Sequence, residues 1–105
     1  MKTKTIVSAA LALLGLLPNA QAQDKEALYV KSLAATCANC HGTNGKAVEG
    51  SSVTSLAGLD KNYTIAQMKA FKTGARPATV MHQISKGYSD AQIESVATYF
   101  AAQKK

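Results

Sequence analysis

Hydrophobic and polar positions alternate with a helical period in three stretches of this chain. The clearest stretch lies near the C-terminus, where Ile93, Val96, Ala97 and Phe100 follow the i, i+3, i+4, i+7 spacing of one helix face. Directly before them, residues 89–92 read Ser-Asp-Ala-Gln, the capping-box pattern that begins a helix. The pattern therefore predicts an amphipathic helix at the C-terminal end of the chain.

A first helix is expected over residues 24–36. Asp24 can accept hydrogen bonds as its N-cap, and Ala27, Val30 and Ala34 share one face. A second helix is expected over residues 62–73.

In that second segment apolar residues recur every third position and a glycine follows as the stop signal; these are Ile65, Met68, Phe71 and Gly74. The segments between the helices are loops by composition: residues 42–58 are rich in glycine, serine and threonine, and residues 74–87 hold only a short turn over 79–85. No segment shows a convincing strand pattern, so the predicted fold class is all-α with three to four helices.

The N-terminus has the pattern of a secretory signal peptide. Two lysines precede an apolar run over residues 6–17, and a small-x-small triplet, Ala20-Gln21-Ala22, follows. The run is shorter than the ~20 apolar residues that cross a bilayer. We expect residues 1–22 to be removed on export to the periplasm, leaving one domain over residues 23–105 that does not span the membrane.

That domain is near the lower size limit for a core held together by apolar side chains alone. The chain has no tryptophan, two phenylalanines and four tyrosines, so a disulfide, a metal or a cofactor is expected to supplement the core. The net charge is +6, but the basic residues form no dense run, which argues against nucleic-acid binding in an exported protein.

The two cysteines stand in the run Cys37-Ala38-Asn39-Cys40-His41. A disulfide across two residues would close a very small loop and stabilise the fold little. A thioredoxin-like pair needs a βαβ context, and a zinc site would have to recruit His82 with poor tetrahedral closure. Cys-x-x-Cys-His is the attachment signature of c-type haem, in which the thiols bond the porphyrin and the imidazole reaches the iron. One covalent haem c on Cys37 and Cys40 is therefore the favoured prediction.

The sixth position of the iron decides the chemistry, and three residues could occupy it. Met68 lies on a predicted apolar stripe, where methionine is usually core filler. Met81 lies in an irregular segment after Pro77 and would favour ferrous iron as a ligand. His82 is adjacent and could ligate on chemistry alone, although a partly exposed side chain is its simpler interpretation.

The order of these features resembles class I c-type cytochromes over the whole mature chain. The haem motif is followed by a glycine-rich loop, the segment Leu56-Ala57-Gly58, a methionine loop and an amphipathic C-terminal helix. The segments 76–81, 84–89 and 96–100 read RPATVM, ISKGYS and VATYF; they resemble the cytochrome subunit of flavocytochrome c sulfide dehydrogenase.

This resemblance implies a cytochrome c fold around one haem, with His41 and Met81 as axial ligands. It also implies that a flavoprotein that oxidises sulfide donates electrons to the haem. Family members pack a small residue of the first helix against an aromatic of the last, which here suggests Ala27 or Val30 against Tyr99 or Phe100.

One departure from the family concerns the imidazole of His41. Relatives commonly carry a proline before the Leu-Ala-Gly segment, in a loop whose carbonyl orients the proximal histidine. Residues 51–55 contain no proline, so the sequence leaves open which carbonyl would accept the hydrogen bond.

Four basic residues flank the methionine segment: Lys69, Lys72, Arg76 and Lys86. They either form a positive rim that steers an acidic redox partner or are ordinary solvated helix faces. The favoured function is a one-electron carrier, as the haem subunit of a sulfide-oxidising complex or as a freely diffusing respiratory cytochrome. A gas sensor would need an open sixth position, and a peroxidase-like enzyme would need a distal acid–base pair.

Overall fold

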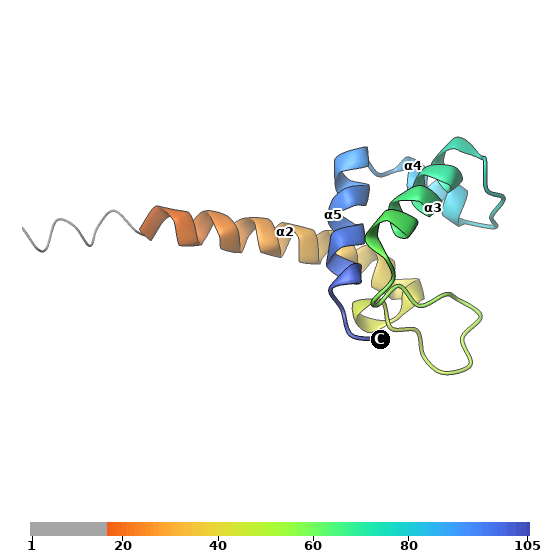
Figure 1. Ribbon diagram of the computed structural model, residues 1–105, viewed down its shortest axis with the longest axis horizontal. Helices are drawn as coiled ribbons and strands as arrows, with labels where there is room; N and C mark the ends of the chain where they lie inside the picture. The colour runs from red at the N-terminus through yellow and green to blue at the C-terminus, as the bar shows by residue number, and fades with distance from the viewer. Residues whose placement is uncertain (1–16) are drawn as a thin grey trace, which may run out of the picture.

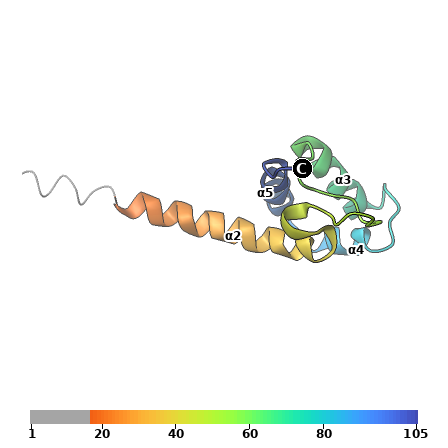
Figure 2. The same cartoon turned by 90° about the horizontal axis from the view of Figure 1, so that it is seen from below.

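The computed structural model describes residues 17–105, with side chains from residue 23 onward. The helices, in chain order, are α2 (Leu17–His41), the 3-10 helix η1 (Thr43–Gly45), α3 (Lys61–Thr73), α4 (Met81–Lys86) and α5 (Asp90–Ala101). These residues contain no strand, so the predicted all-α class is confirmed. In Figures 1 and 2 the end of α2 gathers with α3, α4 and α5, while the first half of α2 projects away from them.

Helix α2 differs from its prediction at both ends. It begins at Leu17 rather than at a cap on Asp24, and it continues past residue 36 through the cysteine motif to His41. The predicted signal peptide, residues 1–22, lies mostly outside the described residues. Within residues 17–105, no helix is both long and apolar enough to cross a bilayer.

The core forms where α2 crosses α5. Ala34, Val96 and Phe100 are buried together, and the half-buried Leu33 and Tyr99 pack against them. The expected small residue, Ala27 or Val30, is therefore wrong. Ala27 is exposed and Val30 half-buried, and both line an open groove beside Tyr99. The buried small side chain that packs with Phe100 is Ala34, one turn beyond Val30.

The other helices begin and end where local chemistry satisfies their free backbone groups. Asp60 caps α3 by accepting a hydrogen bond from the backbone N–H of Tyr63, and Gly74 ends this helix in the left-handed conformation, with φ of 83°. The predicted capping box at the start of α5 is present, since Ser89 and Gln92 exchange side chain to backbone hydrogen bonds. Helix α4 replaces the expected turn over 79–85.

The glycine-rich segment after α2 is closed on itself through the Gly45 carbonyl and is bonded to α5 by Gly58. The carbonyl oxygen of Gly45 accepts hydrogen bonds from the Leu56 N–H at 2.6 Å, the Ala57 N–H at 3.1 Å and the Ser55 hydroxyl at 2.9 Å. The Gly58 N–H then donates to the Phe100 carbonyl at 2.8 Å. These bonds fix the return of the loop beside the end of α2, where the haem motif lies.

Candidate haem site

A cavity of about 480 Å³ opens between the end of α2, the loop before α3, and helices α3 and α4. All four residues that the sequence singled out for cofactor binding line it: Cys37, Cys40, His41 and Met81. Much of the remaining wall is apolar or aromatic, including Leu56, Leu59, Phe71, Val96 and Phe100. Cavities of this size and character are typical of small-molecule and cofactor sites.

His41, the last residue of α2, is oriented by a backbone carbonyl. Its Nδ1 lies 2.6 Å from the carbonyl oxygen of Thr54. Because a carbonyl can only accept, Nδ1 carries the proton, and Nε2 keeps its lone pair free for a metal. This arrangement fixes both the tautomer and the ring orientation, as expected of a metal-ligating histidine.

Thr54 thus answers the question that the missing proline raised. The next three residues, 55–57, all donate hydrogen bonds to the Gly45 carbonyl. The Ser55 hydroxyl oxygen also accepts a hydrogen bond from the Ala47 N–H at 3.0 Å. These contacts hold the loop in place without a proline. The sequence offered no signal for Thr54, because every residue in the loop has a carbonyl.

The two thiols are free and differ in their surroundings: Cys37 is half-buried, while Cys40 is exposed. Burial raises the pKa of the Cys37 thiol, partly opposed by the Thr36 hydroxyl, whose Oγ1 lies 3.9 Å from the Cys37 sulfur. No disulfide joins them, and no group of three or more acidic, cysteine or histidine side chains in the described part of the chain could hold a metal ion.

The opposite side of the cavity carries the candidate sixth ligands. Met81 lines the cavity as the first residue of α4. Met68 also lines it but is buried, and its sulfur accepts a hydrogen bond from the fully buried Ser85 hydroxyl at 3.6 Å. His82 is half-buried and lies outside the lining; its Nδ1 is buried without a hydrogen-bond partner.

The donor set and the walls fit a covalently attached haem. Two thiols lie within one helical turn of an imidazole whose Nε2 is free, and the cavity also holds an uncharged thioether. Sulfur and imidazole nitrogen donors of this kind are ligands that haem iron takes in proteins.

The four basic residues beside the site are only partly free. Lys69 and Lys72 both pair with Asp90, at 3.6 Å and 3.5 Å. The guanidinium of Arg76 stacks over the Phe71 ring at 4.7 Å and bonds to Gln67, whereas Lys86 is exposed and forms no ion pair within residues 17–105.

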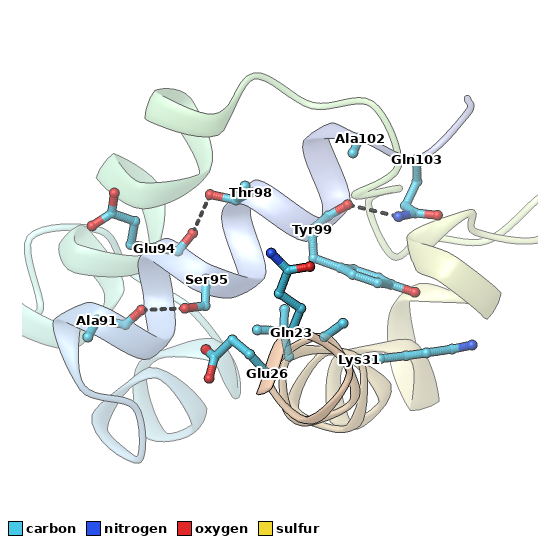
Figure 3. A pocket seen from close by; sticks show the side chains of 12 residues that line it. Gln23, Glu26, Lys31, Ala91, Glu94, Ser95, Thr98, Tyr99, Ala102 and Gln103 are labelled. Carbon is cyan, nitrogen blue, oxygen red and sulfur yellow. Dashed lines mark hydrogen bonds between the residues drawn. The ribbon is translucent and has the colours of Figure 1, made fainter. Parts of the chain in front are cut away.

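A second hollow runs along the projecting part of α2, and it differs in chemistry. This open groove lies between α2 and α5, and Figure 3 shows Glu26, Lys31 and Tyr99 on its walls. It contains no cysteine, histidine or methionine, so it lacks both the thiols for covalent attachment and the histidine and methionine ligands of cytochromes c.

The fold and the cavity define an all-helical domain built to hold haem through a Cys-x-x-Cys-His motif. A family model described as "Cytochrome c" matches residues 27–104. The chain belongs to the cytochrome c family, and this membership, together with the spacing of Cys37 and Cys40, implies covalently attached haem c.

Three relatives illustrate the range of this similarity. The chain is 33% identical over 98 residues to the "Thiosulfate dehydrogenase electron acceptor" of Stutzerimonas stutzeri, covering 90% of this chain and 45% of that protein. It is 38% identical over 68 residues to the "Cytochrome subunit of sulfide dehydrogenase" of Chlorobaculum tepidum, covering 65% and 60%. It is 32% identical over 72 residues to "Cytochrome c-554(548)" of Halomonas halodenitrificans, covering 66% and 86%. The chain thus spans about half the length of the first two proteins.

Proposed function

We propose that this chain is an exported one-electron carrier whose haem iron is held by His41 and Met81 and is reduced by a dehydrogenase of inorganic sulfur compounds. The observation that carries the ligand assignment is that His41 and Met81 line one cavity from two different elements, the end of α2 and the start of α4.

The residues divide the work of holding the cofactor. Cys37 and Cys40 supply the thioether sulfurs, and His41 supplies Nε2 while Thr54 keeps its other nitrogen protonated. Met81 supplies a thioether, which stabilises ferrous iron and raises the reduction potential relative to a second histidine. Bound haem contributes a one-electron couple that needs no proton transfer from the chain.

A methionine in the cavity wall favours a carrier over a gas sensor. A sensor needs an open or weakly held position, whereas Met81 already lies in the cavity wall. A peroxidase-like enzyme needs a distal acid–base pair, and His82 lies outside the lining.

The partner is proposed from the relatives together with the methionine-loop residues. Residues 76–81 and 84–89 resemble the cytochrome subunit of flavocytochrome c sulfide dehydrogenase, and a protein named for that role is 38% identical. We therefore place sulfide first as the source of electrons, through a flavoprotein. Thiosulfate is the second candidate, because an acceptor of thiosulfate dehydrogenase matches more of this chain. A freely diffusing respiratory carrier is the remaining alternative.

The proposed location rests on the N-terminal sequence pattern. The signal-peptide pattern over residues 1–22 supports export, and we propose that the haem protein works in the periplasm. Mass measurement of the haem-bearing protein from native cells checks this, with Gln23 expected as its first residue.

Reduction by native extract tests the partner. Purified ferric protein is mixed with periplasmic extract, sulfide or thiosulfate is added, and haem reduction is followed by absorbance. We expect sulfide to reduce the haem faster with fresh than with boiled extract, and a flavoprotein to copurify with the haem protein. Faster reduction by thiosulfate alone would shift the proposal to thiosulfate dehydrogenase, and equal rates with boiled extract would contradict both.

A further inference from the structure

A tyrosine joins the two sides of the haem cavity. The hydroxyl of Tyr88 lies 2.6 Å from Oγ1 of Thr36. Thr36 belongs to α2, directly before Cys37, and Tyr88 lies in the connection between α4 and α5; both side chains line the cavity. The bond therefore ties the element that carries His41 to the connection that follows the helix beginning at Met81.

The direction of this bond follows from counting protons. The Thr36 hydroxyl has one proton and donates it to the Leu33 carbonyl at 2.7 Å. Its oxygen is then left to accept. Tyr88 is therefore the donor and Thr36 the acceptor, and the hydrogen bond is lost if either the tyrosine hydroxyl or the threonine oxygen is removed.

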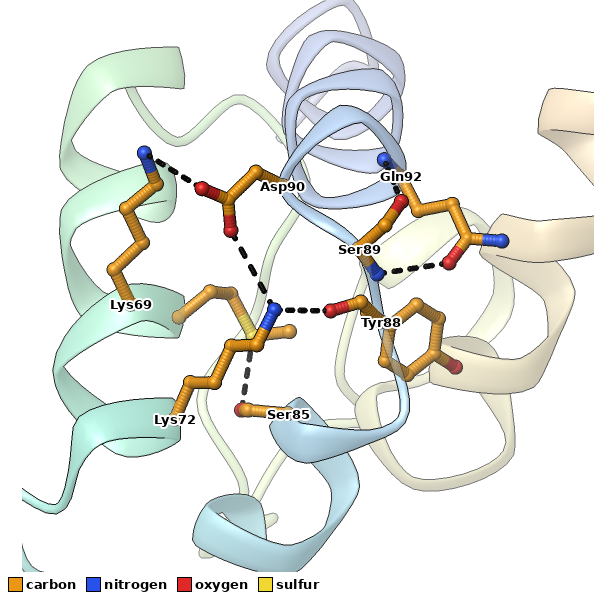
Figure 4. Close-up of polar contacts among 8 residues, drawn as sticks. Lys69, Lys72, Ser85, Tyr88, Ser89, Asp90 and Gln92 are labelled. Carbon is orange, nitrogen blue, oxygen red and sulfur yellow. Dashed lines mark hydrogen bonds and ion pairs between the residues drawn. The ribbon is translucent and has the colours of Figure 1, made fainter.

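The backbone of Tyr88 is fastened on its other side. Its carbonyl accepts a hydrogen bond from Lys72 of α3 at 2.6 Å, and the same ammonium pairs with Asp90 at 3.5 Å. Its N–H donates to the Ser85 carbonyl of α4 at 3.2 Å. Figure 4 shows Lys72 reaching between Asp90 and the Tyr88 carbonyl. Tyr88 thus contacts α2, α3 and α4 at once, through its hydroxyl, carbonyl and N–H.

We infer that Tyr88 is a positioning residue for the sixth ligand. By holding the end of α4 against α2, its hydroxyl bond to Thr36 restricts the movement that would take Met81 away from the iron. This inference rests on the proposed ligation by Met81, and it concerns only how readily an external ligand replaces that thioether.

Imidazole binding to the ferric holoprotein measures this restriction, because imidazole must displace Met81 to bind. Tyr88→Phe removes the hydroxyl and keeps the ring. We expect imidazole to bind about 2- to 12-fold more tightly, the range given by losing one neutral hydrogen bond. Thr36→Val should have the same effect, whereas Thr36→Ser keeps the accepting oxygen and should retain wild-type affinity.

Tyr63→Phe is the matched control. Tyr63 lines the same cavity and is half exposed, and its hydroxyl makes no hydrogen bond among the described residues. This variant should bind imidazole like the wild type. The double variant Tyr88→Phe/Thr36→Val should resemble either single variant, because both substitutions remove one bond.

Two results would overturn the inference and are distinguishable from each other. Unchanged imidazole affinity in Tyr88→Phe, or additive effects in the double variant, would show that the bond does not restrain Met81. If Met81→Ala itself binds imidazole no more tightly than the wild type, the ligand assignment fails, and the positioning role fails with it.

Discussion

At the scale of single residues, the sequence identifies those whose side chains carry the chemistry. Cys37, Cys40 and His41 are recognisable because thioether formation and iron ligation need these residue types at this spacing. The oxygen that orients His41 belongs to Thr54, and it could not be predicted because a backbone carbonyl leaves no trace in residue type. Its position depends on the three-dimensional course of the loop.

Replacing Met81 tests the sixth ligand. Met81→Ala should leave haem attached, because His41 and both cysteines are untouched. The reduction potential should fall, by on the order of 0.1 V within the ~0.8 V that axial ligands set, since the thioether's preference for ferrous iron is lost. Potentiometric titration measures the change, and carbon monoxide should bind the ferrous variant readily.

Two neighbouring residues serve as controls for this substitution. Met68→Leu keeps the apolar volume and should cost less than about 1.5 kcal/mol in the free energy of unfolding. Its visible spectrum should not change, because Met68 is engaged by Ser85. His82→Ala should also keep the methionine-type spectrum. A low-spin form that survives in Met81→Ala but disappears in His82→Ala would move the ligand to His82.

At the scale of helices and loops, the sequence predicts boundaries well where a cap is present. The capping box before α5 and the glycine after α3 both lie where expected. The predicted start of the first helix at Asp24 was wrong, because no strong stop signal separates Asp24 from the residues before it. The predicted small residue that packs against α5 was wrong for a related reason. Periodicity identifies which face of α2 is buried, but it does not identify the position along that face where the two helices cross.

Gly45 tests how the loop is fastened to α5. It has φ of +78°, and a Cβ built there would lie 2.6 Å from the Phe100 ring and 2.9 Å from Leu56. Gly45→Ala should therefore cost about 2–5 kcal/mol, from backbone strain and overpacking together. Chemical denaturation of the holoprotein measures this cost.

Gly50→Ala is the control for that substitution. Gly50 has a similar φ of +79°, but nothing lies within 4 Å of the built Cβ. It should cost only the strain of about 1–2 kcal/mol. Equal losses in the two variants would show that contact with Phe100 contributes nothing.

At the scale of the whole molecule, the cofactor completes the core. Among the described side chains, residues 23–105, the buried apolar ones are few and mostly small, and Phe100 is the largest of them. The same Phe100 lines the haem cavity, so the packed core and the cofactor share a wall. Cys40→Ala should reduce or abolish stable haem incorporation and leave the exported chain with little helicity. A haem-free Cys40→Ala protein with native circular dichroism would contradict this dependence.

Surface charge affects the rate at which a charged redox partner associates with the protein. The ion pairs at Asp90 determine which basic residue is the best one to substitute in a test of this effect. Lys69 and Lys72 are tied to Asp90, so Lys86 is the cleaner probe. Lys86→Glu should slow reduction by an acidic partner by up to about tenfold at low salt. The difference should shrink above about 0.1 M, where the screening length is near 10 Å. Stopped-flow rates measure it.

Lys25→Glu provides the same charge change on the projecting part of α2, away from the cavity. Its rate should stay near that of the wild type. If both variants slow reduction equally, net charge rather than a local docking surface determines the rate.

The positions of the tyrosines make their fluorescence a measure of haem content. With no tryptophan in the chain, ultraviolet emission comes from four phenols. Tyr63 and Tyr88 lie in the cavity wall, while Tyr29 is on α2 and accepts a hydrogen bond from Gln92. Energy transfer to a porphyrin in the cavity would quench the two wall tyrosines most strongly. Tyrosine emission should therefore report, without any label, how much of a preparation carries its haem.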